Sequence, residues 1–197
     1  RSSDLEAAAK EDYPPALCEL GLCYEMAIGV EEDKKVAVAY YTKAAELGYP
    51  PAQCNLGYCY LNGIGTDASS EEAAVWLERA ADQGFARAER LLGCCYRDGD
   101  GVAKDQGKAA ELFRRAAEEG EYPPAICDLG LCYEMGEGVA EDKEKAVAYY
   151  TKAAELGYPP AQCNLGYCFL NGIGAPEDSS KAIPWFDRAA RQGHARS

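Results

Sequence analysis

Ten cysteines are the residues of this 197-residue chain whose side chains could bind a metal or form disulfides. Within a repeat, two of them follow the spacing C-x4-C, as Cys18 and Cys23 do. On a helix of 3.6 residues per turn their thiols diverge by about 140°, so they do not easily share a metal ion. The sequence contains no C-x-x-C pair of the kind that zinc sites use. We therefore expect no metal and no cofactor, and we interpret the cysteines as reduced structural thiols, which favours a reducing compartment.

The cysteines form two columns when the chain is aligned on its internal period. The first column is expected on the buried face of a helix, where a free cysteine behaves as a small apolar residue, and it holds Cys23, Cys59, Cys95, Cys132 and Cys168. The second column is expected on the opposite face, with Arg90 in the third repeat and otherwise Cys18, Cys54, Cys127 and Cys163. Equivalent cysteines of successive repeats should lie about 9–10 Å apart, which is beyond the reach of a disulfide.

Groups that could carry out catalysis are sparse. The single histidine, His194, stands where other repeats have Tyr49, Phe85 and Tyr158, so we interpret it as a ring packed in a turn. The nucleophile motifs S-x-x-K and G-x-S-x-G do not occur. The G-x-G turns never extend to the G-x-G-x-x-G of a phosphate site. We predict no catalytic residue and a protein that is not an enzyme.

The net charge of −13 argues against nucleic-acid binding, which needs clustered Lys and Arg. A basic partner is easier to accommodate, although the acidity could serve solubility alone. No run of about 18 apolar residues predicts a membrane span, and the first residues lack the features of a signal peptide. Ala7–Pro15 matches the close of a repeat, so we expect the chain to be a piece of a longer protein that could carry its own targeting signal.

The strongest pattern is a nested repeat. Tyr13–Gly65 returns 109 positions later as Tyr122–Gly174 with eight of 53 positions changed, and each copy is itself repeated with a period of 36 residues. This period predicts an all-α fold, an α–α superhelix (solenoid) of five helix-turn-helix repeats, as in tetratricopeptide-like proteins. We expect one domain over 1–197, with part of a preceding second helix in 1–14 and repeats at 15–50, 51–86, 87–123, 124–159 and 160–197.

Each repeat is expected to contain a helix A, a glycine-rich turn, a helix B and a second turn. In four repeats helix A begins after a proline such as Pro15. Helix A is expected to end at glycines that adopt a positive φ, and in the first repeat Ala27 occupies this glycine position. Pro184 predicts a kink or a later start of the last helix B. One column predicts the starts of helix B, and it holds Asp33, Ser69, Asp105, Asp142 and Asp178. Another column predicts a close approach of helices A and B, and it holds Gly21, Gly57, Gly93, Gly130 and Gly166. Ser3 and Glu6 have the spacing of a capping box.

The pattern A-x-x-x-L-G-x-x-Y, then G-x-G, then K-A-V-A-Y-Y-T-K-A-A-E-L-G-Y resembles the Sel-one-like repeat family, relatives of tetratricopeptide repeats. The resemblance covers almost the whole chain. It implies a right-handed superhelix that scaffolds protein complexes, with helix A on the concave side. A cysteine-rich bacterial branch of the family is linked to penicillin binding and weak β-lactamase activity. The positions of its stapling disulfide are occupied here by Ala45 and Gln53, so that disulfide cannot form.

The concave face of the A helices is the predicted binding surface for a protein or peptide partner. Asn55 and Asn164 match the place where a tetratricopeptide-like Asn often holds ligand backbone. Tyr and Met beside carboxylates suit a peptide with apolar anchors and some positive charge. The candidate partner-binding residues are Glu19, Leu22, Glu25, Asn55, Tyr58, Leu61, Asn62, Arg90, Cys94, Arg97, Asp98, Asp128, Glu134, Asn164, Tyr167, Leu170 and Asn171.

Three alternatives stay open at this point. The candidate residues could be an ordinary solvated wall, the near-identical copies could belong to an engineered or consensus-type array without a natural partner, and the chain could bind penicillins. End-to-end self-association is a further expectation, since no polar capping helix follows Ala182–Gln192. The departures from the repeat gather in the third repeat, at Arg90, Cys94, Arg97 and Asp98, where we expect specificity to arise.

Overall fold

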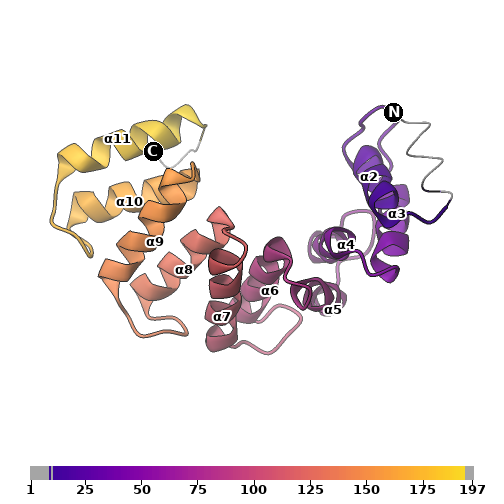
Figure 1. Cartoon of the computed structure of the whole chain (residues 1–197), viewed down its shortest axis with the longest axis horizontal. Helices are drawn as coiled ribbons and strands as arrows, with labels where there is room; N and C mark the ends of the chain where they lie inside the picture. Colours follow the sequence, from indigo (N-terminus) through magenta and orange to yellow (C-terminus); the bar gives the residue numbers. More distant parts are fainter. Residues whose placement is uncertain (1–8, 10, 194–197) are drawn as a thin grey trace. The chain divides into compact units, whose positions relative to one another are not determined.

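The computed structural model describes residue 9 and residues 11–193, and in this part of the chain it contains ten helices and no strand (Figure 1). The all-α fold of five helix pairs is confirmed. The A helices are α2 (Pro14–Glu25), α4 (Pro50–Asn62), α6 (Ala86–Asp98), α8 (Pro123–Met135) and α10 (Pro159–Asn171). The B helices are α3 (Lys34–Glu46), α5 (Ser70–Ala81), α7 (Gln106–Glu118), α9 (Lys143–Glu155) and α11 (Ser179–Arg191).

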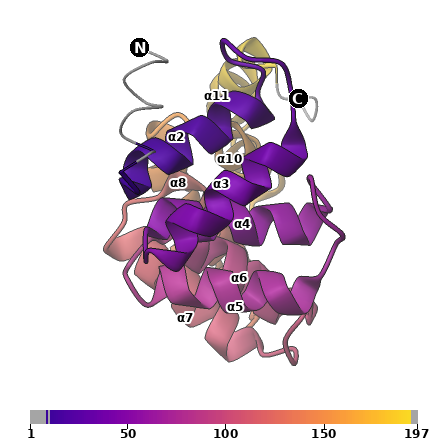
Figure 2. The same ribbon diagram turned by 90° about the vertical axis from the view of Figure 1, so that its right-hand side faces the viewer.

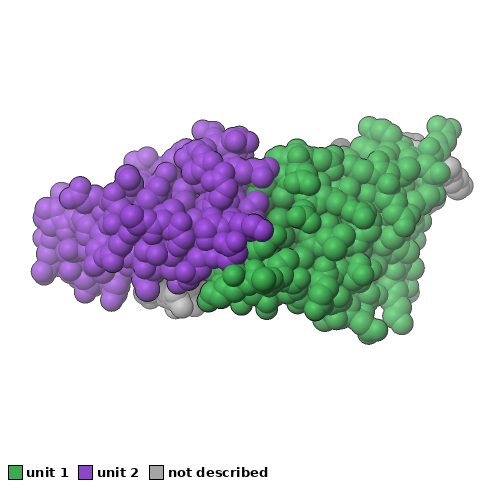
Figure 3. Space-filling view, turned by 90° about the horizontal axis from the view of Figure 1, so that it is seen from below, with its two compact units in different colours: residues 1–104 green, residues 105–197 purple. Residues whose placement is uncertain are grey.

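The helices cluster into two compact units, residues 1–104 and residues 105–197 (Figure 3). In unit 1 each helix from α2 to α6 packs against the next one, and α4 also touches both α2 and α6 (Figure 2). In unit 2 the same holds from α7 to α11, with a further contact between α8 and α10. The division falls inside the third repeat, between its A and B helices. One domain over the whole chain stays a prediction.

All five predicted caps of the B helices are confirmed. The Asp33 carboxylate accepts hydrogen bonds from the backbone N–H groups of Lys35 and Val36, both at 3.0 Å. Ser69, Asp105, Asp142 and Asp178 cap their helices in the same way. Such a side chain satisfies N–H groups that have no partner within the helix, which contributes about 1 kcal/mol per cap.

The glycine-rich turns behave as predicted and also space the repeats. Four A helices end at a glycine with positive φ, such as Gly63 at 64°, and Ala27 takes the same conformation at 55° in the first repeat. The second glycine of the turn has a different role. A Cβ atom on Gly65 would collide with the Lys34 carbonyl oxygen, because this turn packs onto the first turn of the preceding helix B.

The predicted close approach of helices A and B is confirmed where the structure gives the contact. A Cβ atom on Gly57 would lie 2.7 Å from Cγ of Leu77, and one on Gly130 would lie 2.8 Å from the Tyr150 ring. Gly21 and Gly166 face Tyr41 and Phe186 in the same way. Each glycine therefore leaves room for the bulky core residue that helix B contributes.

Some sequence predictions need correction or fall outside the described residues. A later start of the last helix B is wrong, because α11 begins at Ser179 and continues through Pro184 to Arg191. The cap at Asp178 holds the first turn in place, and Pro184 follows it by six residues. His194, the Ser3–Glu6 capping box and most of the partial helix in 1–14 lie outside the described residues. Among the described helices none is long and apolar enough to cross a membrane.

Candidate functional site

Both cysteine columns are buried. The first column packs as predicted, with Cys59 1% exposed, although Cys23 in the first repeat is only half-buried. The second column, which was expected on the opposite face of the helix, is buried as well, since Cys54 is 0% and Cys18 4% exposed. An A helix inside the array packs against helices on more than one side, so its two opposite faces both lose solvent.

Burial lowers the reactivity of these thiols. It raises the pKa of Cys54 to about 11 and that of Cys59 to about 12. The thiolate is the form that attacks electrophiles or binds metals, so a raised pKa disfavours both reactions. Every cysteine that the structure describes is a free thiol, and the described residues contain no group of three metal-ligating side chains. The buried cysteines therefore act as packing residues.

The seventeen candidate residues lie on the A helices, on α2, α4 and α6 in unit 1 and on α8 and α10 in unit 2. Asn55 is the one buried member, at 9% exposure. Six members are exposed, namely Glu19, Asn62, Asp98, Tyr167, Leu170 and Asn171. The other ten are half-buried, namely Leu22, Glu25, Tyr58, Leu61, Arg90, Cys94, Arg97, Asp128, Glu134 and Asn164. We call this set the A-helix surface, and each unit contributes its own part.

Two carboxylates of the A-helix surface accept hydrogen bonds from core tyrosines. The hydroxyl of Tyr41, which is fully buried, donates to Oε2 of Glu25 at 2.5 Å, and Tyr150 donates to Glu134 at 2.6 Å. A buried phenol without an acceptor would cost about 1–3 kcal/mol. These two carboxylates are therefore structural partners of a core tyrosine before they are ligands for anything else.

The sequence carries a signal for this pairing that spacing arguments did not use. Glu25 and Glu134 occur in the two repeats whose B helix has a tyrosine at the core position. The corresponding residues of the second and fifth repeats are Leu61 with Leu77 and Leu170 with Phe186. In these four repeats a carboxylate accompanies a hydroxyl, and a leucine accompanies an apolar core residue.

All four predicted asparagines use their amide groups inside the molecule. Asn62 and Asn171 each donate to a backbone carbonyl one turn earlier, at 2.8 and 2.9 Å, and so close the ends of α4 and α10. Asn55 donates to Sγ of Cys18 at 3.6 Å and accepts a hydrogen bond from Nη1 of Arg87 at 2.9 Å. Both ends of the Asn55 amide are therefore engaged within unit 1, and its role in binding a ligand stays a prediction.

Arg87 is a residue of this surface that sequence reasoning missed. Its guanidinium lies 5.5 Å above the ring centroid of Tyr58 while it donates to Asn55, so it covers two of the predicted partner-binding residues of α4. A signal was available, because Arg87 stands where four other repeats have proline, at Pro15, Pro51, Pro124 and Pro160.

Asn164 in unit 2 is the residue equivalent to Asn55 of unit 1, and its surroundings differ. Its Nδ2 donates to Sγ of Cys127 at 3.6 Å, the same bond that Asn55 makes to Cys18. The neighbouring Tyr167 is 55% exposed and Leu170 is 42% exposed. On α8, Leu131 and Met135 are 36% and 61% exposed. The A-helix surface of unit 2 therefore presents apolar side chains to solvent.

Gln53 and Gln162, also missed at the sequence level, connect successive repeats. Nε2 of Gln53 donates to the carbonyl oxygen of Ala45 at 3.1 Å, and its Oε1 accepts from Nε2 of Gln83 at 2.9 Å. Gln162 repeats the arrangement with Ala154 and Gln192, at 3.2 and 3.0 Å. A buried hydrogen bond thus joins Ala45 and Gln53, the positions that the cysteine-rich branch staples.

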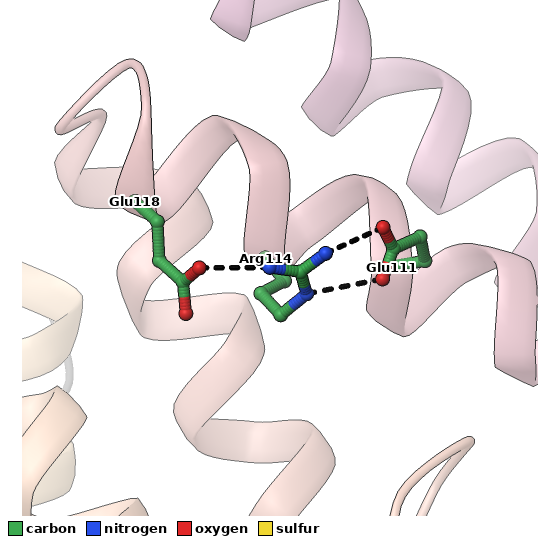
Figure 4. Close-up of polar contacts among 3 residues, drawn as sticks. All are labelled: Glu111, Arg114 and Glu118. Atoms are coloured by element: carbon green, nitrogen blue, oxygen red, sulfur yellow. Dashed lines mark hydrogen bonds and ion pairs between the residues drawn. The ribbon is translucent and has the colours of Figure 1, made fainter.

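The polar features of the third repeat are mainly surface pairs. Arg97 and Asp98 make two hydrogen bonds at 2.9 and 2.8 Å, and this pairing lowers the pKa of Asp98. On α7, Arg114 bridges Glu111 and Glu118 along the helix (Figure 4). Such exposed pairs contribute about 0–1 kcal/mol each. They order side chains without forming a reactive site.

An open hollow of about 470 Å³ lies beside the turn that ends α4, lined by Lys35, Gly63, Gly65, Thr66 and Asp67. It holds one lysine and one carboxylate, without a nucleophile next to a base. This arrangement is that of a gap between a turn and a helix start and does not match a catalytic centre.

Comparison with known proteins identifies the repeat. The family model of the Sel1 repeat matches residues 14–49, 50–85, 86–121, 123–158 and 159–194. A Sel1 repeat protein from Oxalobacter formigenes is 38% identical, with a TM-score of 0.86 over 93% of this chain and 72% of that chain. A protective antigen of uropathogenic Escherichia coli strains, which displays the SLR fold, is 35% identical with a TM-score of 0.85. The match covers 96% of this chain and 40% of the antigen.

A more distant similarity concerns the cysteine rich protein B of Helicobacter pylori, with 28% identity and a TM-score of 0.52 over 66% of this chain and 92% of that chain. No curated protein matches the chain. Five matched repeats and the two structures above 30% identity lead to one conclusion: the chain belongs to the Sel1 repeat family, whose members generally mediate protein–protein interactions and generally lack catalysis of their own.

Proposed function

We propose that this protein is a non-catalytic scaffold that binds a protein or peptide partner through its A-helix surface. The observation that carries the proposal is the exposed apolar set of unit 2, formed by Leu131, Met135, Tyr167 and Leu170 on two helices in contact. Neighbouring exposed apolar side chains on a soluble face are typical of interaction sites, and tyrosine is enriched among the residues that dominate binding energy.

The chemistry of the surface favours a partner with apolar anchors and positive charge. The chain carries a net charge of −13, which attracts and orients a basic segment. Asp128 and Glu134 stand on α8 beside the apolar set. A peptide that places apolar side chains against Tyr167 and Leu170 therefore gains contact area and electrostatic steering together.

The proposal is tested by affinity capture with the full chain as bait, followed by variants. Tyr167→Ala with Leu170→Ala should weaken capture of the partner by about tenfold or more, as expected for anchor residues. Ile183→Ala is the matched control, because Ile183 is 63% exposed but lies on the B helix α11. Loss of the partner on Ile183→Ala with retention on the double variant would place binding on the B helices and refute the proposal.

The proposal assigns no chemistry to the chain. Penicillin binding and β-lactam hydrolysis are linked to the cysteine-rich branch of the family. That branch has a disulfide at the positions where this chain has the hydrogen bond from Gln53 to Ala45. The buried thiols of this chain favour their protonated form. A chromogenic β-lactam should show no turnover above the buffer rate. Turnover that is lost in a variant of the A-helix surface would overturn this part of the proposal.

Self-association is included as a second outcome. If a further copy of the chain is the partner, sedimentation should show concentration-dependent assembly that the same double variant weakens. A chain that stays monomeric over the concentration range of the capture experiment needs a different protein as partner.

A further inference from the structure

We propose that Asn164 and Tyr167 on α10 form a recognition site for an arginine side chain of the partner. The inference rests on the proposed function and adds the chemistry of one anchor. It comes from comparing two copies of the same sequence within one molecule. Residues 50–59 and residues 159–168 are identical, so α4 and α10 start with the same side chains in the same order.

The copy in unit 1 already binds a guanidinium. Arg87 donates to Oδ1 of Asn55 at 2.9 Å and lies 5.5 Å above the ring centroid of Tyr58. The two contacts use different properties of the group, an N–H donor at its edge and a delocalised charge over its face. In this structure, an Asn and a Tyr three residues apart on one helix therefore bind a guanidinium group together.

The copy in unit 2 has the same receptor in an open setting. Nδ2 of Asn164 donates to Sγ of Cys127 at 3.6 Å, as Nδ2 of Asn55 does to Cys18, so the amide is held with Oδ1 as the acceptor. Asn164 is half-buried and the Tyr167 ring is 55% exposed. Within residues 11–193, no side chain donates to Asn164 Oδ1 and no cationic group lies over the Tyr167 ring.

The geometry favours arginine over lysine. An ammonium group can approach a ring or donate to the amide, but it lacks the flat face that stacks while its edge donates. Leu170 lies one turn from Tyr167 on α10, and Leu131 holds the position of Tyr167 on α8, at 42% and 36% exposure. These leucines offer apolar surface to the residues that flank the arginine.

The chain itself contains one competitor. By the 109-residue repeat, the residue that corresponds to Arg87 is Arg196, which lies outside the described residues. A test must therefore separate an arginine of a partner from the chain's own arginine, and Arg196→Ala does this without altering α10.

The test uses the uniformly ¹⁵N-labelled full chain and two acetylated peptides that differ only in a central Arg or Lys between leucines. The Arg peptide should shift the resonances of Asn164 and Tyr167, and its affinity should exceed that of the Lys peptide about tenfold. Tyr167→Ala and, separately, Asn164→Leu should each weaken binding about tenfold. Tyr58→Ala is the matched control and should leave affinity within about twofold, because Arg87 already occupies that copy.

Equal affinity for both peptides, or an equal loss in the Tyr58 and Tyr167 variants, would overturn the proposal. Binding that appears only in Arg196→Ala would also overturn it, since the chain's own arginine would then fill the site. The two hypotheses fail separately. If the Arg peptide does not bind while partner capture still depends on Tyr167 and Leu170, the arginine site is refuted and the proposed function stands.

Discussion

Two identical ten-residue segments face different surroundings in the two units. One contains Asn55 and Tyr58 in unit 1, and the other contains Asn164 and Tyr167 in unit 2. The first pair is covered by Arg87, and the second pair presents an exposed ring. The residue that covers the first pair comes from the neighbouring repeat. Identical local sequence therefore makes an identical helix, and packing decides whether that helix contributes a core contact or a binding surface.

The largest difference between the copies is expected at Gly29 and Gly138, which are equivalent positions with φ of 73° and 74°. Gly29→Ala should cost about 1 kcal/mol for the positive φ alone. Gly138→Ala should cost about 3 kcal/mol, because its Cβ would also collide with the Gln106 carbonyl. No described atom lies within 4 Å of a Cβ at Gly29. Urea unfolding measures both losses, and equal losses would contradict the role of the second turn glycine as a spacer.

The next effect concerns Arg87. Arg87→Ala should lower the free energy of unfolding by about 1–2 kcal/mol, since it removes a charged hydrogen bond and a cation–π contact. It should also convert the Asn55 and Tyr58 pair into a second open receptor, so that the Arg peptide binds at two sites instead of one. Isothermal titration calorimetry measures this ratio. Arg188→Ala, which removes an exposed contact with Trp185, is the control and should change neither quantity.

A small difference is expected where both copies keep the same neighbours. Glu25→Leu and Glu134→Leu should each cost about 2 kcal/mol, because each leaves a buried tyrosine hydroxyl without its acceptor. The two losses should agree within about 0.5 kcal/mol. Adding Tyr41→Phe or Tyr150→Phe, respectively, should restore most of the stability, since the pair then resembles Leu170 with Phe186. Unfolding in urea provides the double-mutant cycles, and a failure to recover would show that the carboxylate stabilises something other than the phenol.

The smallest difference is expected in the response to alkaline pH. Burial raises the pKa of Cys59 and of Cys168 from 9.0 to about 12, and it raises the pKa of Tyr41 and Tyr150 well above the ordinary value of 10.0. Above pH 9 the unfolded chain loses protons that the folded chain retains, so the free energy of unfolding should fall as the pH rises from about 9 toward 12. Stability that stays constant to pH 11 would contradict this.

The two copies should share this response equally. Cys59→Ala and Cys168→Ala should each reduce the pH dependence of stability by the same amount, because burial raises the pKa of both thiols to about 12 and both residues are 1% exposed. Thermal melts between pH 8 and pH 11 compare the two variants. An unequal reduction would indicate that the outer repeat of unit 2 opens before the rest of that unit.

Sequence reasoning was most successful for features that a single repeat contains. The caps at Asp33 and its equivalents, the glycine ends of the A helices and the glycine columns all follow from short-range rules that apply inside one helix pair. It did not give the burial of Cys18, Cys54 and Asn55, because their burial depends on the helix of the next repeat. It also missed Arg87 and Gln53, whose partners are 32 and 8 residues away.

The amino-acid sequence alone determined the period, the helix boundaries, the family and the approach of helix A to helix B. These depend on backbone conformations and side-chain volumes that repeat every 36 residues. The tertiary structure alone decided which copy of a repeated residue is covered and which is exposed. The physical reason is that the solvent exposure of a residue depends on its spatial neighbours, and identical helices in one molecule can have different neighbours.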